Sequence, residues 1–125
     1  MTTMLIVDDE LDMRMLVRLV IEMANDGLKI VGEAADGPEA IQIWRDLDGP
    51  PVPDVVILDN RMPGLSGMEV AQRILEERPG QIIVLYSAFL DADVRAQAAE
   101  VGIRTCVSKH ELDRLPDLIR ELTAA

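Results

Sequence analysis

The chain contains five short apolar runs that are rich in valine and isoleucine and recur at similar spacing. The runs occupy residues 4–7, 28–34, 54–58, 81–86 and 103–107. Several of them are continuous rather than alternating, which is typical of strands buried on both faces of a parallel sheet. The pattern therefore predicts five strands, each followed by a longer segment of mixed character.

The longer segments repeat apolar residues at three- and four-residue steps, which predicts helices with one apolar stripe each. In the segment near residues 10–25, the predicted stripe consists of Leu11, Met15, Leu19 and Met23, widened by Leu16 and Val20. The stripes of the next four segments comprise Ala40, Ile43, Trp44 and Leu47; Val70, Ile74 and Leu75; Val94, Ala98 and Val101; and Leu118, Ile119 and Leu122.

Capping residues mark where several of these helices begin and end. Asp36 is a predicted N-cap, and Ser66 and Glu69 have the spacing of a capping box. The fourth helix is predicted to follow Asp91 and to end at Gly102, since glycine readily takes the left-handed conformation of a helix end.

The fifth helix is predicted to begin near Asp113, with Pro116 in its first turn, where a missing N–H matters least. Strand and helix thus alternate five times, and no internal sequence repeat is present. Such alternation implies parallel strands joined by right-handed crossovers. We therefore expect one α/β domain over residues 1–125, with an open sheet covered by helices on both faces.

Composition narrows the possible classes of protein. The formal net charge is −11, with 23 acidic and 12 basic residues, which argues against nucleic-acid binding by this domain because such binding requires phosphate neutralisation. No run approaches the roughly 18 apolar residues of a membrane span, and the N-terminus lacks the features of a signal peptide. A single cysteine, Cys106, fits a reducing compartment, so we expect a cytoplasmic protein without membrane contact.

Polar residues follow four of the five apolar runs. They are Asp8 and Asp9 after the first run, Asp59 after the third, Ser87 after the fourth and Lys109 after the fifth. Because the carboxyl ends of parallel strands share one edge of the sheet, these side chains are expected to meet there. Three carboxylates in one crevice must either become protonated or gain cations. Mg²⁺ and the lysine ammonium would balance them, and oxygen ligands suit Mg²⁺.

Four segments carry a resemblance to a known family. They read LIVDDE, VVILDNRMPGLSGMEV, IIVLYSAF and TCVSKHE, and together they resemble the receiver domain of two-component response regulators over essentially the whole chain. The resemblance implies a single flavodoxin-like (βα)5 domain, a doubly wound parallel sheet with strand order 2-1-3-4-5. It also implies a signalling phosphoprotein rather than an enzyme acting on small substrates.

The resemblance assigns a role to each of the three aspartates at this edge and to Arg61. Asp59 matches the phosphoacceptor, which takes a phosphoryl group from the phosphohistidine of a sensor histidine kinase or a phosphotransfer protein. Asp9 and Asp59 match carboxylate ligands of Mg²⁺, and the backbone carbonyl of Arg61 matches a further ligand. Asp8 would hold the ion through water. We also consider the hypothesis that the Arg61 side chain covers the phosphoryl group and alters its lifetime.

The resemblance further matches Ser87 to the switch hydroxyl and Lys109 to the phosphoryl-binding lysine. Two positions depart from the common receiver pattern. Cys106 stands where many receivers have an aromatic switch residue, and His110 follows the lysine where many have proline. Neither change removes a group that phosphoryl transfer requires, although both bear on how the signal reaches a partner.

The expected output surface lies around the fourth helix, fifth strand and fifth helix. That surface, or the first and fifth helices, could form a homodimer, and an output domain fused to the receiver is a further expectation. Two other functions stay open. One is a Mg²⁺-dependent phosphohydrolase with Asp59 as its nucleophile, and the other is a flavin-binding module of the same fold.

Overall fold

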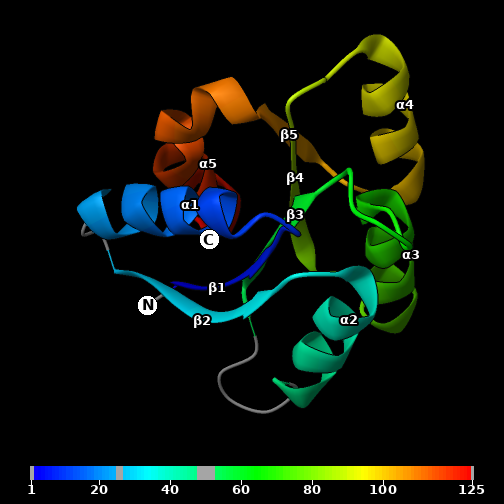
Figure 1. Ribbon diagram of the computed structural model, residues 1–125, viewed down its shortest axis with the longest axis horizontal. Helices are drawn as coiled ribbons and strands as arrows, with labels where there is room; N and C mark the ends of the chain where they lie inside the picture. Colours follow the sequence, from blue (N-terminus) through cyan, green and yellow to red (C-terminus); the bar gives the residue numbers. More distant parts are fainter. Residues whose placement is uncertain (1, 25–26, 48–52, 125) are drawn as a thin grey trace.

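The computed structural model describes residues 2–24, 27–47 and 53–124. Five parallel strands form one sheet in the order β2-β1-β3-β4-β5, which confirms the predicted order (Figure 1). The strands are β1 (Thr2–Val7), β2 (Leu28–Ala34), β3 (Val55–Asp59), β4 (Ile82–Ser87) and β5 (Thr105–Ser108). Each strand lies within about two residues of a predicted run, and β1 begins two residues before its run.

Helices cover both faces of the sheet, as the alternation of elements predicts (Figure 1). One face carries α1 (Leu11–Ala24) and α5 (Leu115–Thr123), and the other carries α2 (Gly37–Asp46), α3 (Gly67–Glu77) and α4 (Ala92–Val101). A 3-10 segment, η1 (Lys109–Arg114), connects β5 to α5. The fifth helix therefore begins slightly later than predicted, with Pro116 in its first turn. No helix in the described ranges is long and apolar enough to cross a bilayer.

The predicted caps form, and each one marks the residue at which a helix begins or ends. The Asp36 carboxylate accepts a hydrogen bond from the Glu39 N–H at 2.8 Å, and the Asp91 carboxylate caps α4 in the same way. The Ser66 hydroxyl accepts from the Glu69 N–H at 3.3 Å at the start of α3. Gly102 ends α4 with φ +105°, a conformation that residues with a side chain rarely adopt.

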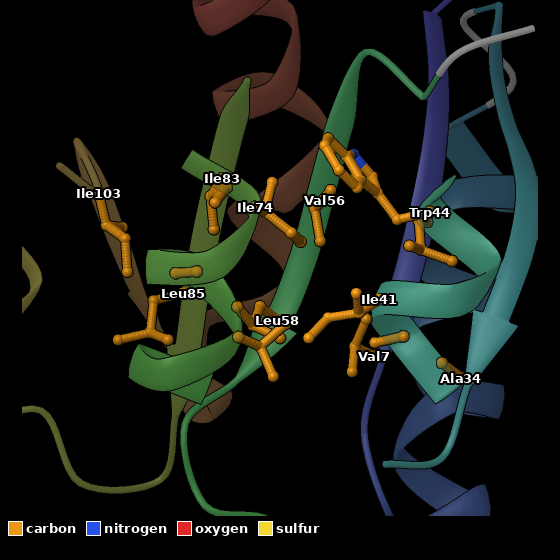
Figure 2. Close-up of a cluster of buried hydrophobic side chains, with 14 of the residues drawn as sticks. Val7, Ala34, Ile41, Trp44, Val56, Leu58, Ile74, Ile83, Leu85 and Ile103 are labelled. Carbon is orange, nitrogen blue, oxygen red and sulfur yellow. The ribbon is translucent and has the colours of Figure 1, made fainter. Parts of the chain in front are cut away.

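The core consists of two apolar layers, one on each face of the sheet. Figure 2 shows the layer beneath α2, α3 and α4, in which Val56 and Leu58 of β3 meet Trp44 and Ile74. The alternate β3 residues, Val55 and Ile57, face the layer beneath α1 and α5. A strand that is apolar on both faces is therefore fully buried, as its continuous apolar run predicts.

The predicted apolar stripe of α1 is wrong. Five of its six residues are exposed, with 43% to 76% of their surface accessible; they are Leu11, Met15, Leu16, Leu19 and Met23. The buried residues of the helix are Val17 and Ile21, and Met13 and Val20 pack beside them. Because α1 is apolar on two sides, residues at four-residue steps define two stripes, and periodicity alone does not identify the buried one.

Candidate functional site

The carboxyl edge of the sheet gathers residues from four strands. Asp8 follows β1, Asp59 ends β3, Ser87 ends β4 and Lys109 follows β5. The strand register pairs Asp59 with Tyr86 and Ser87 with Ser108. These four residues therefore lie at the same edge because the strands that carry them are parallel.

Two buried carboxylates share one ammonium group at this edge. The Lys109 Nζ lies 3.3 Å from Asp8 Oδ2 and 3.2 Å from Asp59 Oδ1. Asp8 is 0% exposed and Asp59 is 2% exposed, so solvent does little to stabilise either charge. The three residues come together as the sequence predicts, and the charge of the carboxylates exceeds that of the lysine.

The surplus of negative charge perturbs the titration of the group. Burial, together with the nearby Asp8 carboxylate, raises the pKa of Asp59 from 3.8 to about 6, although Lys109 and the Arg61 N–H act in the opposite direction. Burial alone would lower the pKa of Lys109, but the two carboxylates outweigh it and raise that pKa. Lys109 is therefore a permanent cation, while Asp59 holds its charge against an unfavourable environment.

Among the described residues, Asp8 has two further hydrogen-bond partners. Its Oδ1 accepts from the Glu10 N–H at 2.8 Å, and its Oδ2 accepts from the Tyr86 hydroxyl. Tyr86 is fully buried, and its ring lies beneath Lys109, with Nζ 5.0 Å from the ring centroid. Burial, with the Asp8 carboxylate, raises the pKa of Tyr86 far above its ordinary value, so the phenol stays protonated.

Sequence reasoning did not identify Tyr86 as a part of the site. The available signal was a phenol inside a buried apolar run, directly before Ser87. A buried phenol requires a hydrogen-bond partner.

The residues present fit a divalent cation. The carboxylate oxygens of Asp8, Asp9 and Glu10 lie within 4.8 Å of one another, and Asp9 and Glu10 are exposed. All are hard oxygen donors, which suit Mg²⁺ better than softer metals. The uncompensated charge of Asp8 and Asp59 beside a single lysine adds to the attraction for a cation. The individual ligand roles of Asp9, Asp59 and the Arg61 carbonyl stay predictions, as does the water-mediated role of Asp8.

Ser87 and Arg61 lie in the loops that follow β4 and β3. The Ser87 hydroxyl is buried and exchanges hydrogen bonds with the backbone N–H and carbonyl of Phe89, both at 3.2 Å. The Arg61 N–H donates to Asp59 Oδ1 at 3.4 Å, and its guanidinium lies 4.8 Å from the centroid of the Phe89 ring. The Ser87–Phe89 turn and the Arg61–Phe89 contact thus connect the two loops beside Asp59.

Helix α3 begins directly against the backbone of Asp59. The Gly67 N–H donates to the Asn60 carbonyl at 2.9 Å. A Cβ atom on Gly67 would lie 2.8 Å from the Asn60 Cα and closer still to the Asp59 carbonyl oxygen. Glycine is therefore required here by space rather than by backbone conformation.

The two departures from the receiver pattern have local structural settings. Cys106 is half-buried on β5 and packs against the apolar layer beneath α2, α3 and α4. The backbone N–H of His110 donates to the Ser108 hydroxyl at 3.1 Å, which caps η1. A proline at this position could not make that bond because it has no N–H.

Comparison with known proteins places this geometry in a family. The sequence model of the family described as the response regulator receiver domain matches residues 4–120 of this chain. Protein-glutamate methylesterase/protein-glutamine glutaminase 3 of Hahella chejuensis is 35% identical over 120 residues, which cover 94% of this chain and 33% of that protein. The nitrate/nitrite response regulator protein NarL of Escherichia coli K12 is 36% identical over 85 residues, covering 68% of this chain and 37% of NarL.

Solved structures agree on the fold. The CheX–CheY–BeF3–Mg²⁺ complex of Borrelia burgdorferi matches with a TM-score of 0.88 at 22% identity, covering 99% of this chain and 90% of that one. The chain spans about a third of the length of the first curated relatives that it matches.

Proposed function

The chain belongs to the family of response regulator receiver domains of two-component systems, and from this premise we propose that Asp59 is its phosphoacceptor. The phosphoryl donor is a phosphohistidine on a sensor histidine kinase or a phosphotransfer protein. The observation that supports the proposal most directly is the contact of Lys109 with two buried carboxylates, Asp8 and Asp59. The family match favours this function over a phosphohydrolase or a flavin-binding module.

The contacts of Asp59 suggest which oxygen reacts. Within the described residues, Lys109 and the Arg61 N–H both contact Oδ1. We therefore assign the attack on phosphorus to Oδ2. An Oδ2–P bond forms as the N–P bond of the phosphohistidine breaks, and the electron pair of that bond goes to the imidazole nitrogen.

Lys109 then binds the negatively charged phosphoryl group. Phosphorylation replaces one carboxylate charge with about −1.5 to −2 and three acceptor oxygens. The Lys109 ammonium, already beside Asp59, can donate to one of these oxygens. Mg²⁺, held by Asp9, Asp59 and the Arg61 carbonyl and through water by Asp8, would neutralise the charge that develops during transfer. The CheY structure named above contains Mg²⁺, which supports this choice of metal.

Ser87 is proposed as the switch residue. Its hydroxyl is bonded to the backbone of Phe89, so a new bond to the phosphoryl group would exchange one partner for another and change the loop after β4. We propose that this change reaches the surface formed by α4, β5 and α5, where an output domain or a partner protein binds.

Mass spectrometry tests the phosphoacceptor directly. The protein is incubated with acetyl phosphate, with Mg²⁺ or with EDTA, and its intact mass is measured. We expect one added phosphoryl group in the wild-type protein with Mg²⁺, and none in Asp59→Asn. Asp113→Asn, which changes an exposed aspartate, is the matched control and should be modified like the wild-type protein. Modification of Asp59→Asn, or modification that does not depend on Mg²⁺, would contradict the proposal.

A further inference from the structure

Tyr86 makes two contacts that the phosphoryl-transfer reaction does not require. Its hydroxyl donates to Asp8 Oδ2, and its ring lies under the ammonium of Lys109. The side chain is fully buried, and in the sheet register it is the neighbour of Asp59. A single phenol thus contacts two of the groups that the proposed reaction uses and lies beside the third.

The hydrogen bonds of Asp8 determine what this carboxylate can still bind. A carboxylate offers about four lone-pair sites. In the described structure, Oδ1 accepts from the Glu10 N–H, and Oδ2 accepts from the Tyr86 hydroxyl and contacts Lys109. Three sites are therefore engaged, and both lone-pair sites of Oδ2 are among them. One site on Oδ1 remains for a water molecule bound to a cation.

We propose that Tyr86 is a positioning residue of the magnesium site, and that its hydroxyl fixes the orientation of Asp8 and weakens the affinity of the site for Mg²⁺. The inference rests on the proposed function, since it assumes that Asp8 and its neighbours bind Mg²⁺. It adds a residue to the site and states in which direction that residue changes the binding of the metal.

The direction follows from competition for one negative charge. In the metal-free protein, the Tyr86 hydroxyl adds a third donor, beside the Glu10 N–H and Lys109, that stabilises the buried Asp8 anion. A cation is attracted by the same negative charge. Each donor that already binds Asp8 therefore reduces the free energy that the cation gains by binding there. Removing the hydroxyl therefore destabilises the metal-free protein more than the metal-bound protein. By thermodynamic linkage, the variant binds Mg²⁺ more tightly.

The test compares Tyr86→Phe with the wild-type protein. Phenylalanine keeps the ring beneath Lys109 and removes only the hydroxyl. Titration calorimetry with MgCl₂ should give a dissociation constant about three- to tenfold lower for the variant, which corresponds to the net contribution of one typical hydrogen bond. Thermal unfolding should show a lower Tm for Tyr86→Phe in EDTA, and a smaller difference from the wild-type protein in saturating Mg²⁺.

Trp44→Phe is the matched control. It also removes one donor from a buried aromatic residue, because the Trp44 indole N–H bonds to the Gln81 side chain at 3.0 Å. That bond lies at the opposite edge of the sheet, near the start of β4. We expect Trp44→Phe to lower the Tm equally with and without Mg²⁺ and to leave the dissociation constant unchanged.

An unchanged or weaker Mg²⁺ affinity in Tyr86→Phe would overturn the inference, and so would an equal loss of Tm with and without the metal. If the wild-type protein itself does not bind Mg²⁺, the magnesium site fails first and the inference fails with it. A second measurement needs no Tyr86 variant, because Tyr86 is the only tyrosine. Adding Mg²⁺ to the wild-type protein should shift its tyrosine absorption band along the binding curve, and a band that does not move would contradict the inference.

Discussion

Lys109 contacts two buried carboxylates, those of Asp8 and Asp59. The proposed phosphoacceptor, Asp59, is the one with the weaker set of additional hydrogen bonds. Asp8 has the Glu10 N–H and the Tyr86 hydroxyl as additional donors. Asp59 has only a long bond from the Arg61 N–H beside its contact with Lys109, among the residues described. These two contacts do not offset burial and the nearby Asp8 carboxylate, which raise the pKa of Asp59 to about 6.

The raised pKa predicts a pH-dependent cost of Asp59 to the fold. The folded protein binds the Asp59 proton more tightly than the unfolded chain, whose pKa is near 3.8, so the ionised group destabilises the fold above about pH 6. In EDTA at pH 7.5, Asp59→Asn should therefore be more stable than the wild-type protein, by about 2–3 kcal/mol. The difference should shrink as the pH falls from 6 to 4, measured by urea unfolding at each pH.

The control for this prediction is again Asp113→Asn, whose side chain is exposed. Its stability should follow that of the wild-type protein across the pH range. A difference between Asp59→Asn and the wild-type protein that stays constant from pH 4 to 7.5 would show that Asp59 is not perturbed by its surroundings.

Sequence reasoning predicts where residues arrive at the site better than it predicts what they bind. Asp8, Asp59 and Lys109 were expected to meet because the carboxyl ends of parallel strands share an edge. The bond from Tyr86 to Asp8 could not be predicted, because it depends on how a buried ring is rotated within its packing. Likewise, the bonds of Ser87 to Phe89 depend on the conformation of a loop.

Helix α1 shows the corresponding limit for a whole element. Its existence and its bounds were predicted within about one residue, but its orientation was not. A helix with one apolar stripe can face the core in one way, whereas α1 carries two. The side that is buried is decided by packing against β1, β3 and α5, which no local pattern contains.

Two alanine substitutions test the orientation of α1. Ile21 is 1% exposed and Leu19 is 51% exposed, although both are large aliphatic residues on the same helix. We expect Ile21→Ala to lower the free energy of unfolding by about 2–5 kcal/mol, because it leaves a cavity. Leu19→Ala should change it by less than about 0.5 kcal/mol. Denaturation in urea measures both, and a larger loss for Leu19→Ala would mean that the helix faces the core with its other side.

The packing of α3 against β3 gives a second test at the level of elements. In Gly67→Ala the added methyl group would meet the backbone of Asp59 and Asn60, which cannot move aside as a flexible side chain can. We expect a loss of at least about 1–3 kcal/mol of stability from this overpacking. Phosphorylation by acetyl phosphate should also slow, since the displaced backbone carries Asp59.

Gly80→Ala is the matched control for Gly67→Ala. A Cβ atom at Gly80 has no neighbour within 4 Å, so the change should be neutral or slightly stabilising. Equal stability and equal phosphorylation of the two variants would contradict the close approach of α3 to Asp59.

For the molecule as a whole, charge complicates any test of the magnesium site. At a net charge of −11, added salt of any kind reduces self-repulsion and raises stability. A specific site adds a further gain that grows with the ratio of Mg²⁺ concentration to its dissociation constant.

We therefore expect the Tm of the wild-type protein to rise more in MgCl₂ than in NaCl of equal ionic strength. Asp9→Asn removes a predicted ligand that lies on the surface, and it should lose most of the excess while keeping the response to NaCl. Equal increases in the two salts for the wild-type protein would show that the cation acts only by screening.

The contact between Lys109 and Asp8 also has a mechanical side. β5 is a strand of four residues at the margin of the sheet, and among the described strands it pairs only with β4. Lys109, which follows β5, extends past β4 and β3 to Asp8 at the end of β1. This ion pair therefore links the edge strand to the centre of the sheet. If phosphorylation of Asp59 draws Lys109 away from Asp8, as we propose, this link weakens. We then expect faster amide hydrogen exchange in β5 of the phosphorylated protein than in the unphosphorylated protein.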